Sequence, residues 1–92
     1  MKDTTRNVIE DILVCDLGDM IPHYEIVNSI DIMSSVEFDK TSKIDKEKLQ
    51  DALNKGMKYL STIAKPIQIE AMNSIYQQQI MYTFHNIAKA LV

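Results

Sequence analysis

Residues 66–92 decide the fold class and read PIQIEAMNSIYQQQIMYTFHNIAKALV. The stretch carries only two formal charges, on Glu70 and Lys89, yet glutamines and asparagines interrupt it too often for a membrane span. From residue 67 to residue 91 apolar side chains recur at three- and four-residue spacing, which predicts a helix about 37 Å long. A long helix with so few charges must cover its surface with the rest of its own fold or with a partner, so this stretch indicates an interaction role.

The helix predicted over 67–91 has two apolar faces. We expect its main stripe to form an interface, and this stripe consists of Ile69, Tyr76, Ile80, Phe84, Ile87 and Leu91. A second patch lies to the other side and consists of Ile67, Ile75, Met81, Tyr82 and Ala88. Two apolar faces are more than a small antiparallel hairpin requires. The pattern therefore predicts that the protein associates with itself through this helix.

The helix that precedes Pro66 has the clearest pattern in the chain. Asp45 is a good N-cap, because a carboxylate there accepts hydrogen bonds from free backbone N–H groups, and we expect a helix over about 46–64. Pro66 disfavours helical geometry at the residue before it and so interrupts the pattern. Gly56 lies inside the apolar stripe, where it costs about 1 kcal/mol relative to Ala unless another helix approaches closely. The stripe consists of Leu49, Ala52, Leu53, Met57, Leu60, Ile63 and Ala64.

The N-terminal third of the chain predicts another amphipathic helix, over residues 4–20. Its apolar residues recur at helical spacing and are Ile9, Ile12, Leu13, Leu17 and Met20. Thr4 or Thr5 is expected to cap its start, since a hydroxyl there can accept from a free backbone N–H. Gly18 and Pro22 mark its end.

Residues 22–38 allow two interpretations. A helix over about 22–34, followed by an extended stretch, places Ile26, Ile30 and Met33 on one face, and we favour it. The alternative is a strand, because apolar residues also alternate with polar ones through much of the segment. A strand here would have no evident partner within the chain, so it would predict a sheet between molecules.

Length and composition place these elements in one domain. A chain of 92 residues forms a single domain, and two glycines and two prolines are too few for an all-β fold. We expect an all-α protein, either a small three- or four-helix bundle or a helical hairpin with an N-terminal helix. In this domain, residues 1–92, an acidic helical front at 4–38 precedes a polar linker at 39–45 and a helical hairpin at 46–92.

Charge is distributed unevenly along the chain. Residues 1–39 hold nine acidic residues against Lys2 and Arg6, a net charge of −7, whereas residues 40–65 hold seven lysines against three acids, a net charge of +4. Either the two regions attract each other or both are solvated, or the acidic region is a docking face for a basic partner. No nucleic acid partner is expected, because the chain is acidic overall and its basic region lacks arginines and interleaved aromatics.

The sequence predicts no catalytic, cofactor-binding or metal-binding residues, and therefore no enzymatic activity. His23 and His85 lack ligands at metal-site spacing, and we expect both on the solvated surface. Cys15 cannot form an internal disulfide and is expected to be a buried thiol, because it lies in an apolar helix. With no signal-peptide pattern and no membrane-spanning segment, we expect a cytoplasmic protein, or one exported without a cleaved signal peptide.

One family resemblance concerns roughly the last 45 residues. A helix, Pro66, the sequence IQIEAMNSI at 67–75 and a polar-rich helix to the C-terminus together resemble the terminal hairpin of small type III secretion rod and needle subunits. The acidic front is not typical of that family. The resemblance implies a part of a secretion-related assembly, or its small chaperone.

Two functional hypotheses follow from the sequence. The first is a non-enzymatic protein–protein interaction module, an assembly subunit, adaptor or chaperone, that forms a homo-oligomer through its C-terminal helix. The second is a small acidic inhibitor or immunity protein that binds a basic site on an enzyme or on a nucleic-acid-binding protein. Salt separates them, because an acidic interface weakens steeply with ionic strength whereas an apolar helix interface does not.

Overall fold

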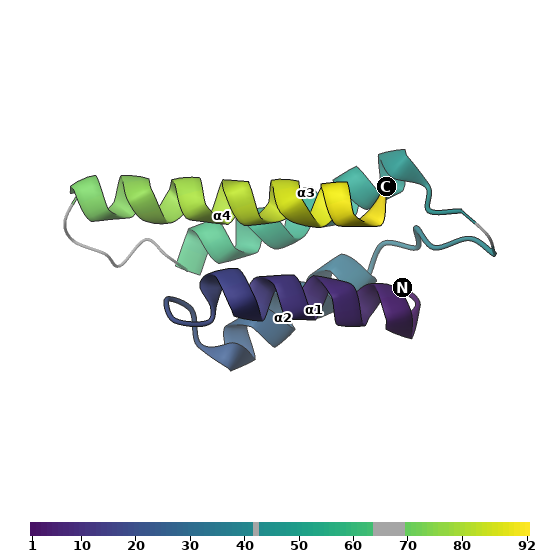
Figure 1. Cartoon of the computed structure of the whole chain (residues 1–92), viewed down its shortest axis with the longest axis horizontal. Coiled ribbons are helices and arrows are strands. Elements are labelled where there is room, and N and C mark those ends of the chain that lie inside the picture. The colour runs from purple at the N-terminus through teal and green to yellow at the C-terminus, as the bar shows by residue number, and fades with distance from the viewer. Residues whose placement is uncertain (42, 64–69) are drawn as a thin grey trace.

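The chain folds into an up-and-down bundle of helices (Figure 1). The computed structural model describes residues 1–41, 43–63 and 70–92, with the side chains of 70–73 excepted. These residues contain the helices α1 (Asp3–Leu17), α2 (His23–Ser34), α3 (Lys46–Ile63) and α4 (Glu70–Leu91). Over the same residues there is no strand, and only an isolated antiparallel bridge joins Asp39 to Ile44. The prediction of an all-α bundle is confirmed, with four helices.

The four helices form two layers. Helix α1 packs against α2 and α4, and α3 packs against the same two helices, so α1 and α3 lie diagonally opposite each other. Figure 1 shows α1 and α2 in one layer and α3 and α4 in the other, with consecutive helices antiparallel and both termini at the same end. The molecule measures 45 × 22 × 20 Å. Each helix therefore keeps one face turned outward.

The core lies between the layers and follows the helical periodicity of the sequence. In α1 it consists of Ile9, Leu13 and Leu17, which are four residues apart and fully buried. Each such side chain contributes about 1.5–3 kcal/mol through removal of its apolar surface from water. Buried apolar residues from the other segments complete the core: Ile21, Ile26, Ile30, Met33, Val36, Phe38, Leu49, Ala52, Leu53, Leu60, Ile80, Phe84 and Ile87.

Helix α2 confirms the favoured interpretation of residues 22–38. Ile26, Ile30 and Met33 are buried at helical spacing, whereas Tyr24, which the strand alternative would align with Ile26 and Ile30, is 67% exposed. The extended residues that follow still serve the core, because Phe38 is fully buried there. The structure therefore follows the helical spacing of the apolar residues and not their alternation with polar residues.

Gly56 is a point of close contact between α2 and α3. A Cβ added to Gly56 would lie 2.8 Å from both Cγ and Sδ of Met33, which is fully buried. The absence of a side chain on α3 therefore makes room for Met33 of α2. This contact offsets the helix propensity that a glycine loses.

The ends of the helices agree with the sequence in one place and depart from it in another. Asp45 caps α3, since its Oδ1 accepts from the backbone N–H groups of Glu47 at 3.1 Å and Lys48 at 3.2 Å, as predicted. The cap expected from Thr4 or Thr5 at α1 is replaced by a distant residue. The carboxylate of Asp39 accepts from the Lys2 backbone N–H at 2.6 Å.

Two boundaries differ from those predicted. Helix α1 ends at Leu17 rather than at residue 20, so Met20 falls in the following turn and is 36% exposed, while Ile21 takes the buried position. Helix α4 is described from Glu70 onward. The predicted break at Pro66, and the predicted helical residues 67–69, lie outside the described residues.

Candidate interaction surface

The stripe of α4 predicted to form an interface faces the chain's own core. Ile80 and Ile87 are fully buried and Phe84 is 4% exposed. Tyr76 and Leu91 are half-buried and pack against the same core, and Ile69 lies outside the described residues. While the chain keeps this fold, these side chains contact its own core rather than a partner. Self-association through α4 remains a prediction, but it has to use the other face of the helix.

The outward face of α4 carries the second apolar patch. Ile75, Met81 and Tyr82 are 61%, 60% and 60% exposed. No residue between Glu70 and Lys89 carries a formal charge at neutral pH. The sequence located this patch, but it could not rank the two faces, because α4 has apolar residues on both and few charges to mark the solvent side.

A groove between α3 and α4 adjoins this face and has no counterpart in the sequence pattern. Its volume is about 250 Å³, and its lining comes from both helices: Gln50, Leu53, Asn54, Met57, Met81, Phe84, His85 and Ala88. None of these side chains is formally charged when His85 is neutral. The groove is therefore an uncharged depression with an exposed methionine, Met81, at its edge.

The α3 side of the groove continues this uncharged surface. Gln50, Asn54, Met57 and Ser61 follow one another at helical spacing along the flank of α3 that faces α4. Gln50 donates to the side-chain oxygen of Asn54 at 2.9 Å, and Gln77 of α4 donates to the backbone carbonyl of Ser61 at 3.2 Å. These bonds hold the two helices and the polar rim of the groove in register.

Tyr76 ties α4 to the turn after α1. Its hydroxyl donates to the backbone carbonyl oxygen of Met20, and burial raises the pKa of the Tyr76 phenol. The aromatic ring packs against the core at the same time. Tyr76 therefore fixes the orientation of α4 about its own axis, and with it the side of the helix that faces outward.

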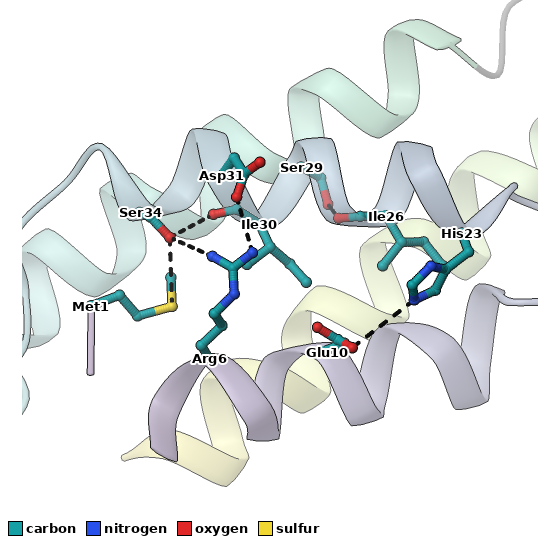
Figure 2. Close-up of polar contacts among 9 residues, drawn as sticks. All are labelled: Met1, Arg6, Glu10, His23, Ile26, Ser29, Ile30, Asp31 and Ser34. Carbon is teal, nitrogen blue, oxygen red and sulfur yellow. Dashed lines mark hydrogen bonds and ion pairs between the residues drawn. The ribbon is translucent and has the colours of Figure 1, made fainter. Parts of the chain in front are cut away.

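The α1–α2 layer is joined by polar contacts, shown in Figure 2. Arg6 of α1 reaches across to α2, where its guanidinium donates to Asp31 at 3.0 Å and to the hydroxyl of Ser34 at 3.3 Å. Further along the same pair of helices, His23 lies 4.0 Å from Glu10. These partly exposed pairs add about 0–1 kcal/mol each, so they set register more than stability.

The acidic and lysine-rich regions do not form ion pairs with each other in the described part of the chain. There the acids of residues 1–39 pair only with Arg6 and His23, and Lys55 pairs with Asp51 of its own helix at 3.9 Å. Most of the charged side chains of the α1–α2 layer and of α3 are exposed, whereas Glu25 and Asp39 are half-buried and hydrogen-bonded within the chain. Residues 1–39, with a net charge of −7, therefore form an acidic surface.

A polar cluster links α2 to α3 at the edge of the bundle. The Tyr59 hydroxyl donates to Oε1 of Glu25 at 2.8 Å, and the side-chain amide of Asn28 donates to the same oxygen at 3.0 Å. The bond to Glu25 raises the pKa of Tyr59, because ionisation would remove the donated proton and place two negative charges together. The cluster therefore joins the two helices.

Residues with reactive or ligating side chains are dispersed. Within the described residues, no group of three or more His, Cys, Asp or Glu side chains is placed to hold a metal ion. Cys15 is exposed, and the expectation of a buried thiol is wrong, because the core stripe of α1 runs through Leu13 and Leu17 on another side of the helix. His23 and His85 are both exposed, as expected.

Three comparisons with known proteins complete this description. No protein-family model, curated protein or solved structure matches the chain. Among the helices described, none has both the length and the hydropathy that crossing a membrane requires. A function for the chain therefore has to be argued from its own surface.

Proposed function

We propose that the protein is a non-enzymatic interaction module that associates with a second copy of itself through the outward face of α4. The observation that carries this proposal is the set of three large apolar side chains, Ile75, Met81 and Tyr82, each about 60% exposed on one helix. Isolated exposed apolar residues are ordinary. Ile75 and Tyr82 lie seven residues apart and so point the same way, whereas Met81 lies about 100° round the helix, at the groove. Together they give the uncharged outward surface of α4 an apolar patch that is typical of a protein contact.

The charge pattern of α4 supports a second copy as the partner. In a symmetric pair the same surface lies on both sides, so each charged residue near the axis meets its own like charge. A surface without charges avoids that repulsion, and the outward face of α4 carries none from residue 74 to residue 88. Residues 1–39 have a net charge of −7, which would disfavour contact between the acidic layers of two copies.

The test compares two tyrosines at the same solvent exposure. Tyr82→Glu places a charge on the proposed surface, and we expect it to abolish association in sedimentation velocity. Tyr24→Glu is the matched control, because Tyr24 is 67% exposed on α2, away from α4. It should leave association unchanged. Equal association in both variants would exclude the outward face of α4 as the contact.

A self-associating module of this kind suits an assembly subunit, an adaptor or a chaperone. A secretion-related role follows only from the resemblance of residues 46–92 to rod and needle subunits. Helix-mediated pairing is the property that these classes share. The proposal therefore concerns the contact between copies. Partner proteins captured from the native cell would identify the process that uses it.

A second candidate function is supported by the unpaired acids of the α1–α2 layer. Among the described residues, the nine acidic residues of 1–39 have one ion pair, Arg6–Asp31, while Glu10 lies 4.0 Å from His23 and pairs with it only when the imidazole is protonated. Such a surface suits a small acidic inhibitor or immunity protein that occupies a basic site.

Salt dependence tests this second candidate. Binding to a basic probe, poly-L-lysine, should weaken at least about tenfold between roughly 50 mM and 500 mM salt, because exposed charges are screened at the higher concentration. Charge reversal at Asp11 and Asp19, which are exposed, should weaken it further. Binding that is absent at low salt, or that ignores both changes, would exclude a specific acidic docking face.

A further inference from the structure

We propose that the groove between α3 and α4 receives the Met81 side chain of a second copy, so that two molecules pair about a twofold axis with their α4 helices antiparallel. This inference rests on the proposed self-association and specifies its geometry. Each copy offers one protruding side chain, Met81, and beside it one depression lined by Leu53, Met57 and Phe84. A twofold axis lets both depressions be filled by the same contact.

The groove has the size and chemistry for this side chain. Its volume of about 250 Å³ is several times the ~30 Å³ that one water molecule takes in the liquid, so it has room for the four heavy atoms of a methionine side chain. Leu53, Met57 and Phe84 supply apolar and aromatic contacts, and the flexible thioether of methionine adapts to an irregular depression and contacts aromatic rings favourably. Gln50 and Asn54 form a polar rim that can exchange hydrogen bonds with the facing copy.

The lack of charge in the groove disfavours a partner that is recognised by its charge and suits a second copy of the same uncharged surface. The groove's lining residues and the adjoining α4 face carry no formal charge at neutral pH. Gln50, Asn54 and Ser61 along α3 are uncharged as well. A partner recognised by its own charge would find nothing complementary here. A second copy meets the same uncharged surface, and Lys89 marks the edge of the contact.

The surface area that a stable pair must bury also requires the groove to be part of the contact. The side chains of α4 that the structure describes begin at residue 74 and end at Leu91, so one face about 27 Å long and 10 Å wide covers roughly 270 Å² per copy, or about 540 Å² in total. A specific interface should bury more than about 1,000 Å². Extending the contact over the groove and the flank of α3 roughly doubles the width, to about 1,100 Å² in total. A contact that includes the groove therefore reaches the size that a specific interface needs.

The first test alters two residues of the groove, Met81 at its edge and Asn54 at its rim. Met81→Ala should weaken dimerisation about tenfold or more in sedimentation equilibrium. Asn54→Trp, which fills the groove from its rim, should weaken it by a similar factor. Met20→Ala is the matched control, because it shortens another exposed methionine in the turn after α1 and should leave the dissociation constant unchanged.

The second test observes the contact directly in a mixed sample of isotope-labelled and unlabelled protein. Met81 and Ala88 are seven residues apart on one helix, about 10.5 Å along its axis, so they are too distant for a cross-peak within one chain. Isotope-filtered spectra should show a nuclear Overhauser effect from the Met81 methyl of one copy to the Ala88 methyl or the Phe84 ring of the other. These residues line the groove.

The outcomes separate this inference from the function on which it rests. One outcome is that Tyr82→Glu abolishes dimerisation while Met81→Ala and Asn54→Trp leave it intact. In that case the outward face of α4 is the contact, and the groove does not receive Met81 of the second copy. A wild-type protein that is monomeric at every concentration overturns both. Dimerisation that is lost in all three variants, together with the intermolecular cross-peak, supports both.

Discussion

Asp39 shows how a single residue can hold distant parts of this fold together. Its carboxylate accepts from the backbone N–H of Lys2 at 2.6 Å and from the hydroxyl of Thr5 at 3.1 Å. The connection between α2 and α3 thereby caps the start of α1, where a negative charge also favours the positive end of the helix dipole. The sequence suggested Thr4 or Thr5 because caps are usually local, and nothing in it marks a cap from a residue 37 positions away.

Replacing Asp39 with Ala should lower the free energy of unfolding by about 1–2 kcal/mol, since the substitution removes the cap and its charge. Urea denaturation followed by circular dichroism measures the change. Glu37→Ala is the control, because Glu37 is an exposed carboxylate in the same connection, and we expect a change within about 0.5 kcal/mol. Equal effects at both positions would show that Asp39 acts only through its general charge.

Tyr59 predicts a loss of stability at high pH. Its pKa is raised from 10.0 by the hydrogen bond it donates to Glu25, so in alkali the unfolded chain releases this proton first. The stabilisation is therefore complete below the unfolded pKa and is lost as the pH rises through the higher pKa of the folded state. Between roughly pH 9 and pH 11 the wild-type protein should lose stability faster than Tyr59→Phe. Parallel curves of unfolding free energy against pH would contradict this role of Tyr59.

At the scale of whole helices, the accuracy of a sequence-based prediction depends on how sharply the two sides of a helix differ. In α3 the lysines lie on one side and Leu49, Leu53 and Leu60 on the other, and the structure buries the expected side. In α4 both sides carry apolar residues and no charge separates them. The packing of α1 and α3 against α4 decides which side of α4 is buried. This packing is tertiary structure, so the pattern within α4 alone does not reveal it. The α3–α4 groove has the same origin, because it exists only once two helices pack.

Phe84→Ala tests the orientation of α4. Phe84 is 4% exposed within the core, so its truncation should leave a cavity and cost about 3–5 kcal/mol of unfolding free energy. This is a large part of the ~5–10 kcal/mol expected of a small domain, so partial unfolding at room temperature is expected. Tyr82→Ala is the control on the outward face and should change stability by less than about 0.5 kcal/mol. A Phe84→Ala variant that keeps its stability but loses assembly would mean that α4 turns its other side inward.

The whole molecule combines an acidic layer, a lysine-bearing helix and an uncharged face on a third side. Residues 1–39 have a net charge of −7 and residues 40–92 a net charge of +4, and no ion pair joins an acid of the first group to a lysine of the second among the described residues. Two kinds of association are thus open to the same chain. Contact between oppositely charged faces of two copies would depend on salt, whereas contact between two α4 faces would not.

Sedimentation equilibrium of the wild-type protein at two salt concentrations tests the central claim most directly. With the protein between about 5 and 200 μM, the mean mass should rise from 10.6 kDa toward twice that value, with the same midpoint at about 50 mM and 500 mM salt, because an uncharged contact is not screened. A mass of 10.6 kDa at every concentration, or a mass that rises only at low salt, would contradict self-association through the uncharged face of α4.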